Sequence, residues 1–338
     1  MVSPLMWREV LAGLEAQGVQ ARAVPVERIG EVGRRAGEAM ADAGFADDVV
    51  GRIAADFATA LPDAPPDARS GEPRPWRSVV IAAVARPLTQ ANLTWHGEKR
   101  TVAVPPHYAG YYAVPRAIAH RVDELLRPAG YGAAFHEPPL KTLAACSGLA
   151  RYGRNNVTYV AGLGSWLQLA ACVSDAPPPD DAEWDEPQVL DRCERCSACL
   201  SACPTGAIAG DRFVLHTDRC LTWHNESDDP FPDWLDPSAH HCAVGCLRCQ
   251  QVCPENVHVD LVHAPPEWFD EEETAAILAA EDLAAADLAA KGGDGEAGDE
   301  AGHDWAGLSA ATREKLARCG LDYSPGVIAR NIRALLGA

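Results

Sequence analysis

The chain has 338 residues, 47% of them hydrophobic, which excludes a disordered chain and allows two or three modules with cores of their own. Its 48 acidic residues against 29 basic ones give a formal charge of −19, which argues against nucleic acid as a partner because phosphates are repelled. The opening MVSPLMWREVLAGLEAQG has the pattern of an amphipathic helix rather than of a signal peptide, and no apolar run approaches the length of a membrane span. We therefore expect a cytoplasmic protein with no membrane partner.

In chain order, residues 1 to about 60 are expected to be helical, up to the loop-forming stretch LPDAPPDARSGEPRP. The β-branched run WRSVVIAAVARP, closed by Pro87, predicts a strand buried on both faces. Helices are predicted over about Pro115 to Arg127 and from about Leu140. Because strands alternate with helices, we expect an α/β domain up to about residue 175, followed by the separator APPPDDAEWDEP.

These composition changes divide the chain into three parts. We expect an α/β domain at 1–187, a cysteine-rich module at 188–262 and a helical tail at 263–338. The tail contains an acidic low-complexity linker at about 288–304.

The stretch CERCSACLSACPTGAI carries the strongest chemical signal. Its cysteines follow the spacing C-x2-C-x2-C-x3-C before Pro204, and they are Cys193, Cys196, Cys199 and Cys203. This is the spacing of bacterial ferredoxins, in which three thiolates bind one 4Fe–4S cube and the fourth binds the neighbouring cube. Zinc is the alternative, but zinc sites typically use C-x2-C pairs that are far apart. The spacing therefore predicts two 4Fe–4S clusters.

The second motif, CAVGCLRCQQVCP, is less regular. Counted back from its Cys–Pro pair, the ferredoxin positions are Cys253, Cys249 and Cys246. The next ferredoxin position is Ala243, which Cys242 misses by one residue. Two cubes need eight thiolates and the regular positions supply seven. The eighth is Cys242 or the isolated Cys220, and spacing leaves both open.

At these motifs the chain resembles the epoxyqueuosine reductases and, more distantly, the corrinoid-dependent reductive dehalogenases, over residues 76 to 262. That family has an isolated cysteine in an R-C-[IL]-[ST] context between its two motifs, and DRCLT at 218–222 matches it. The resemblance therefore selects Cys220 over Cys242. It implies one cluster on Cys193, Cys196, Cys199 and Cys253, and a second on Cys203, Cys220, Cys246 and Cys249.

The same resemblance implies a cobalamin, bound with its base detached from cobalt, in the stretch before the cysteine module. The family forms that pocket with a G-L-G-x-x-G-K-N loop and a later G-S-W, which correspond to GLARYGRNN and GSW. The residues so implied are Gly148, Gly153, Arg154, Asn155, Gly164, Ser165 and Trp166. The implied architecture is a corrinoid-reductase-like α/β N-terminal domain, fused to an α+β ferredoxin-like double-cluster module with a helical C-terminal tail.

The family's catalytic aspartate, in a D-S-A-P element, has no counterpart in the stretch AAFHEPPL. His136 and Glu137 are the candidates for a general acid there. The prolines that follow them favour an extended backbone, whose successive side chains point in opposite directions, so only one of the two can face the site. We favour Glu137, because a carboxylic acid in an apolar pocket stays protonated near neutral pH.

Two functions follow from these patterns. The first is a reductase that passes low-potential electrons through two 4Fe–4S clusters to a corrinoid cobalt, for reduction of a small organic substrate other than tRNA. Its donor would be of ferredoxin or flavodoxin type. The alternative is an electron carrier or reductive activator that docks a corrinoid or other redox protein. No P-loop and no G-x-G-x-x-G occurs, so neither ATP nor a Rossmann-bound nicotinamide is indicated.

Overall fold

The computed structural model describes residues 4–45, 50, 60–64, 73–211, 213–280, 305 and 307–337. The linker predicted at about 288–304 lies outside these ranges. Among the described helices, none has both the length and the hydropathy that a membrane crossing requires.

A four-stranded sheet organises the N-terminal part. Its order is β1 (Val19–Pro25), β2 (Ser78–Ala85), β8 (Leu167–Ser174) and β5 (Ala133–Phe135). All three pairings are antiparallel, so the sheet is not the parallel one that alternating strands and helices usually build. The mixed α/β content is as predicted. The first 60 residues are not purely helical, because β1 follows the first helix.

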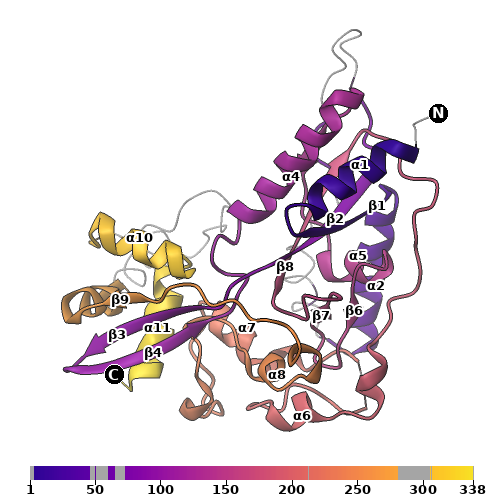
Figure 1. Cartoon of the computed structure of the whole chain (residues 1–338). Coiled ribbons are helices and arrows are strands. Elements are labelled where there is room, and N and C mark those ends of the chain that lie inside the picture. Colours follow the sequence, from indigo (N-terminus) through magenta and orange to yellow (C-terminus); the bar gives the residue numbers. More distant parts are fainter. Residues whose placement is uncertain are drawn as a thin grey trace.

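Helices cover both faces of this sheet (Figure 1). On one face α1 (Pro4–Glu15) and α4 (Ala113–Leu126) pack against alternate residues of β2 and β8. On the other face α2 (Arg28–Asp42) and α5 (Leu140–Cys146) pack against the intervening residues. All eight residues of β8 and the first six of β2 are buried. This confirms the predicted strand and explains why it reads as an unbroken apolar run.

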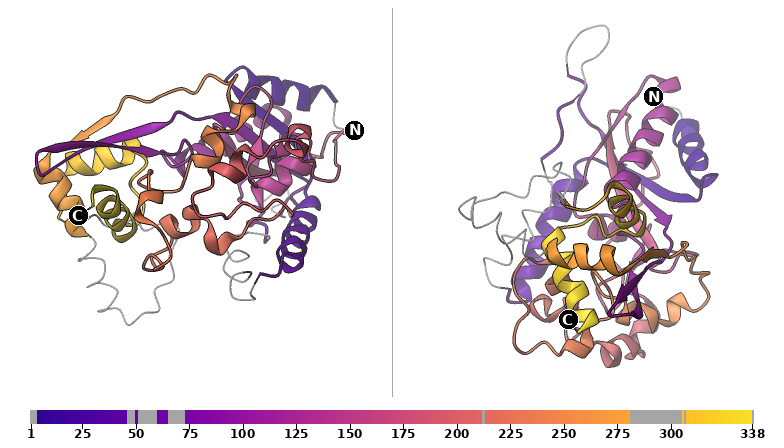
Figure 2. Two further views of the ribbon diagram at one scale, coloured as in Figure 1. Left: turned by 90° about the horizontal axis from the view of Figure 1, so that it is seen from below. Right: turned by 90° about the vertical axis from the view of Figure 1, so that its left-hand side faces the viewer.

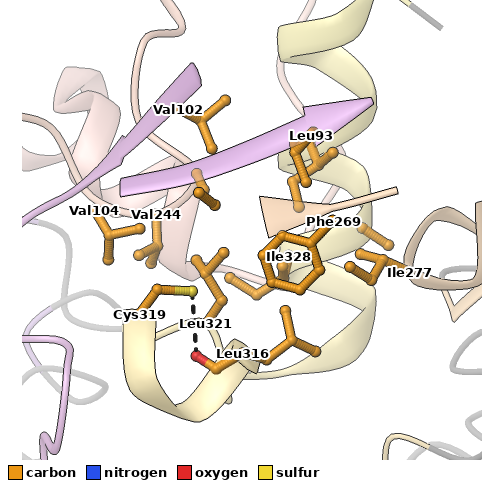
Figure 3. Close-up of a cluster of buried hydrophobic side chains, with 14 of the residues drawn as sticks. Leu93, Val102, Val104, Val244, Phe269, Ile277, Leu316, Cys319, Leu321 and Ile328 are labelled. Carbon is orange, nitrogen blue, oxygen red and sulfur yellow. Dashed lines mark hydrogen bonds between the residues drawn. The ribbon is translucent and has the colours of Figure 1, made fainter. Parts of the chain in front are cut away.

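A second core joins the middle of the chain to its C-terminal part. The hairpin of β3 (Thr89–Trp95) and β4 (Glu98–Val104) pairs in parallel with β9 (Glu267–Phe269). Figure 3 shows the hairpin and β9 packed on the helices beneath them. These helices are 271–280, α10 (Ala310–Cys319) and α11 (Pro325–Leu336). Phe269 is 1% exposed at the centre of this cluster.

The cysteine region lies between the two cores (Figure 2, left). It consists of loops and short helices, which are η2 (Asp191–Glu194), α6 (Ala198–Ala202), η3 (Thr217–Arg219), α7 (Leu221–Glu226), η4 (Pro237–Ala239), α8 (Arg248–Gln251) and η5 (Pro254–Asn256). Such short segments bury little apolar surface, so their shape depends on groups that hold them from outside. Two short strands, β6 (Arg151–Tyr152) and β7 (Thr158–Tyr159), form a hairpin just before this region.

Candidate functional site

The first group of thiols brings together the two ends of the cysteine region. Burial, and next the charge of Cys193, raises the pKa of the Cys199 thiol, and Cys253 and Cys196 act in the same direction. The pKa of Cys253 is also raised by burial and, more weakly, by Cys193. The charge of Cys253 therefore interacts with the thiols of the first loop, although more than fifty residues separate them in the sequence.

The second group forms in the same way. Burial raises the pKa of Cys246 to about 12, and the charges of Cys242, Cys220 and Cys203 act in the same direction. Burial raises the pKa of Cys249 most, and the charges of Cys246 and Cys220 act in the same direction. Among the described residues, no three or more His, Cys, Asp and Glu side chains converge as they would on one metal ion. The thiolates of a 4Fe–4S cube bind different irons and have no such common point.

Cys242 has a different environment from Cys220. Cys242 is fully buried in a hydrophobic cluster with Leu88, Trp166 and Leu247. Cys220 instead precedes α7 and lines a cavity of about 900 Å³. The other cysteines on the cavity wall are Cys203, Cys246 and Cys249. One cavity therefore has a whole group of four thiols on its wall.

Of the seven residues implied by the resemblance, two line this cavity, Asn155 and Ser165. The other five, which are Gly148, Gly153, Arg154, Gly164 and Trp166, are not on its wall. Arg154 points to the first group of thiols: its backbone N–H donates to Cys193 Sγ at 3.4 Å, and its guanidinium donates to the Cys193 carbonyl. The structure therefore does not bring Arg154 to the cavity.

The glycines of these loops have packing roles. A Cβ on Gly153 would lie 2.6 Å from the ring of Tyr159, which is 5% exposed. Gly164 has a φ of +57°, and a Cβ there would overlap Asn256 Oδ1. Asn256 accepts from the Ser165 backbone N–H at 2.9 Å and donates to Ser165 Oγ at 2.8 Å. The G-S-W loop is thus hydrogen-bonded to Asn256, three positions after Cys253.

His136 and Glu137 differ in their surroundings. Glu137 lines the cavity and is half-buried. His136 is 5% exposed and not on the cavity wall, and no described group hydrogen-bonds to its Nε2 atom. Burial lowers the pKa of His136, so it is neutral near pH 7.

The cavity wall holds further polar groups, of which Tyr111, Lys141 and Glu226 were not identified from the sequence as site residues. The Tyr108 hydroxyl donates to Glu226 Oε1. Burial, and then the charge of Glu137, raises the pKa of Tyr111. Burial lowers the pKa of Lys141. Glu226 follows Cys220 by six residues on α7, a spacing that alone carries no recognisable signal.

Comparison with known proteins places these features in a class. Residues 192–256 match the family described as 4Fe-4S double cluster binding domain. The matched segment holds every cysteine of the two groups. By this match and by its thiols, the chain contains a 4Fe–4S binding domain at residues 192–256.

The relatives give a more particular answer. The chain is 33% identical over 142 residues to an epoxyqueuosine reductase of Pseudomonas aeruginosa, covering 41% of this chain and 38% of that protein. It is 28% identical over 205 residues to that of Burkholderia pseudomallei, covering 57% and 47%. The epoxyqueuosine reductase structure from Bacillus subtilis superposes with a TM-score of 0.60 at 18% identity, over 98% of this chain and 81% of that one. The predicted resemblance to the epoxyqueuosine reductase family is confirmed, although these matches span less than half the length of the curated relatives.

One prediction needs correction. An epoxyqueuosine reductase has been solved with a tRNA-Tyr epoxyqueuosine-modified tRNA stem loop, so the prediction that argued against nucleic acid as a partner is wrong. The argument used net charge, which is a property of the whole chain. Residues 281–304 alone hold eight acidic residues and one lysine, so the charge is spread unevenly along the sequence.

Proposed function

We propose that the chain is an iron–sulfur oxidoreductase that reduces an epoxide bound in the 900 Å³ cavity, with two 4Fe–4S clusters supplying the electrons. One observation carries the proposal: Cys203, Cys220, Cys246 and Cys249 line the same cavity as Glu137. A cluster on these thiols would stand in the wall of the substrate site. The relatives' name assigns an epoxide to them, and we extend that class of substrate to this chain.

Two observations support cobalamin as a ligand of this cavity. A volume of about 900 Å³ is at the upper end of the range for ligand sites. The Oε1 atom of Gln168, a residue 5% exposed on the cavity wall, accepts no hydrogen bond from any described group. A buried acceptor of this kind needs a donor, and the corrin ring carries carboxamide N–H groups. Asn155, Ser165 and Gln168 would hold the ring, and cobalamin when bound would supply a low-potential cobalt centre.

The chain's own residues would supply the proton. Reduction of an epoxide takes two electrons and two protons and gives an alkene and water, or an alcohol, according to which bonds break. Glu137 and Glu226 both line the cavity, but Glu226 accepts a hydrogen bond from the Tyr108 hydroxyl, so we assign the proton to Glu137. The neighbouring Tyr111 keeps its own proton because its pKa is raised. The apolar wall formed by Leu167, Leu169 and Ile208 would exclude water.

The test begins with protein loaded anaerobically with iron and sulfide, to which hydroxocobalamin is added before desalting. We expect about eight irons per chain and a retained corrinoid with the visible spectrum of the base-off form. Turnover is then measured with an epoxyqueuosine-containing tRNA stem loop and with the free epoxynucleoside. Loss of all corrinoid on desalting would refute the cofactor assignment, and no product from either substrate would refute the reductase.

A further inference from the structure

The first group of thiols opens onto a different part of the surface from the second. Cys196 lines a shallow hollow of about 850 Å³. The rest of its wall comes from residues 190–192, Glu194, Arg195, Ser197, Pro254, Glu255 and Arg151. None of these residues lines the 900 Å³ cavity. An external electron carrier can therefore approach the first cluster without entering the substrate site.

Two ion pairs hold the hollow in shape, and Arg195 and Glu194 on the same wall take part in neither. Arg151 pairs with Asp191 at 2.6 Å, and Arg192 pairs with Glu255 at 2.6 Å. Arg195 is exposed, and within the described part of the chain it has no ion-pair partner. The hollow holds as many arginines as carboxylates, whereas the whole chain carries −19. An acidic partner would be repelled less by this hollow than by a surface with the average charge of the chain.

Aliphatic side chains lie exposed beside the same hollow. Val257 is 70% exposed and Val252 is 41% exposed. They flank Cys253 and the hollow residues Pro254 and Glu255 in the sequence. Exposed valines next to a redox centre offer apolar area that a partner can cover. The interface would be small and transient, as is typical of electron-transfer encounters.

We propose that this face, defined by Arg192, Arg195, Val252 and Val257, is the docking surface of an acidic one-electron carrier protein. The carrier gives one electron to the first cluster and leaves oxidised, and the cluster is reduced with no bond or proton change. The proposal rests on the proposed function only in that both clusters must be present. Under this proposal electrons would enter at the hollow that Cys196 lines and would pass to the thiols on the cavity wall.

The test uses the chain loaded with iron and sulfide, without cobalamin or substrate. A photochemically reduced plant-type 2Fe–2S ferredoxin is mixed with it, and the second-order rate of cluster reduction is followed by absorbance. We expect Arg195→Glu and Val257→Asp each to slow this reduction about tenfold at 10 mM salt. The charge effect of Arg195→Glu should shrink at 150 mM salt, where the Debye length falls to about 8 Å. Reduction by dithionite should stay unchanged.

Two matched variants change the same side chains elsewhere. Arg127→Glu alters a guanidinium that is 65% exposed at the end of α4, and Leu5→Asp alters an aliphatic side chain that is 59% exposed on α1. Both should reduce at the wild-type rate. Equal rates for all four variants, or equal losses in the controls, would overturn the docking surface. So would an Arg195→Glu chain that keeps its ferredoxin rate and loses affinity for an RNA stem loop. Iron content is measured first, so an absent cluster counts against the proposed function and not against this surface.

Discussion

Replacement of Gly164 by alanine should uncouple the G-S-W loop from the cysteine region. Gly164 has a φ of +57°, where an L side chain costs about 1 kcal/mol or more. Its new methyl group would also overlap Asn256 Oδ1 and displace the Asn256 side chain. The two hydrogen bonds between Asn256 and Ser165 would then be lost, each with a net value of about 1 kcal/mol. We expect a total loss of about 3 kcal/mol in the free energy of unfolding.

Gly162 offers a matched control in the same loop. Its φ is +78°, and a Cβ there would meet nothing within 4 Å. Gly162→Ala should therefore cost only the backbone term of about 1 kcal/mol. Guanidinium unfolding of the cluster-loaded protein, followed anaerobically by tryptophan fluorescence, measures both variants.

A double-variant cycle separates the overlap from the backbone strain. Asn256→Ala removes the hydrogen bonds and also the atom that the new methyl group would strike. Adding Gly164→Ala to that background should cost about 1 kcal/mol instead of about 3. Equal losses for Gly162→Ala and Gly164→Ala, or full additivity in the cycle, would refute the role given to Asn256.

Other substitutions test the thiols, the acid and the response to pH. Cys220→Ser should lower the iron content from about eight to about four per chain, whereas Cys242→Ser, in its hydrophobic cluster, should keep both clusters. Glu137→Gln should slow turnover more than tenfold, and His136→Gln should not, because only Glu137 faces the cavity. Burial, with Lys141 next, lowers the pKa of His107 from 6.5 to about 4, so its contribution to stability is present above pH 6.5 and lost as pH falls towards 4. Unfolding at pH 7 and pH 5 should show His107→Gln losing about 1–2 kcal/mol less than wild type on acidification.

The cysteine ligands are the part that the sequence predicts best, because their spacing is local and its chemistry is narrow. The match of residues 192–256 to a double-cluster domain agrees with that spacing. The strand at Ser78–Ala85 is predicted for a similar reason, since burial on both faces leaves a continuous apolar run. By contrast, β1 is not predicted, although VQARAVP alternates between apolar and polar residues at its start. Its alanines give only a weak period-two signal within a helix-rich region.

The cavity wall is harder to predict, because its residues come from segments that the sequence keeps far apart. The wall residues Tyr108, Glu226 and Ser165 hydrogen-bond to partners that lie 118 or 91 positions away. Neither composition nor spacing records such contacts. Of the residues that the resemblance implies for the pocket, Asn155 and Ser165 line the cavity, whereas Arg154 contacts the Cys193 loop instead.

The C-terminal segment belongs to this site rather than being an appendage to it. Helix α7 has only six residues, so its last carbonyls lack partners within the helix. Side chains from the C-terminal segment supply them: Arg330 donates to the His224 carbonyl at 2.7 Å, Asn331 to the Asn225 carbonyl at 2.9 Å, and the Tyr323 hydroxyl to the Glu226 carbonyl at 3.2 Å. Cys220 precedes α7 and Glu226 ends it, and both line the cavity. The helix between Cys220 and Glu226 is therefore held in place by side chains of residues 323–331.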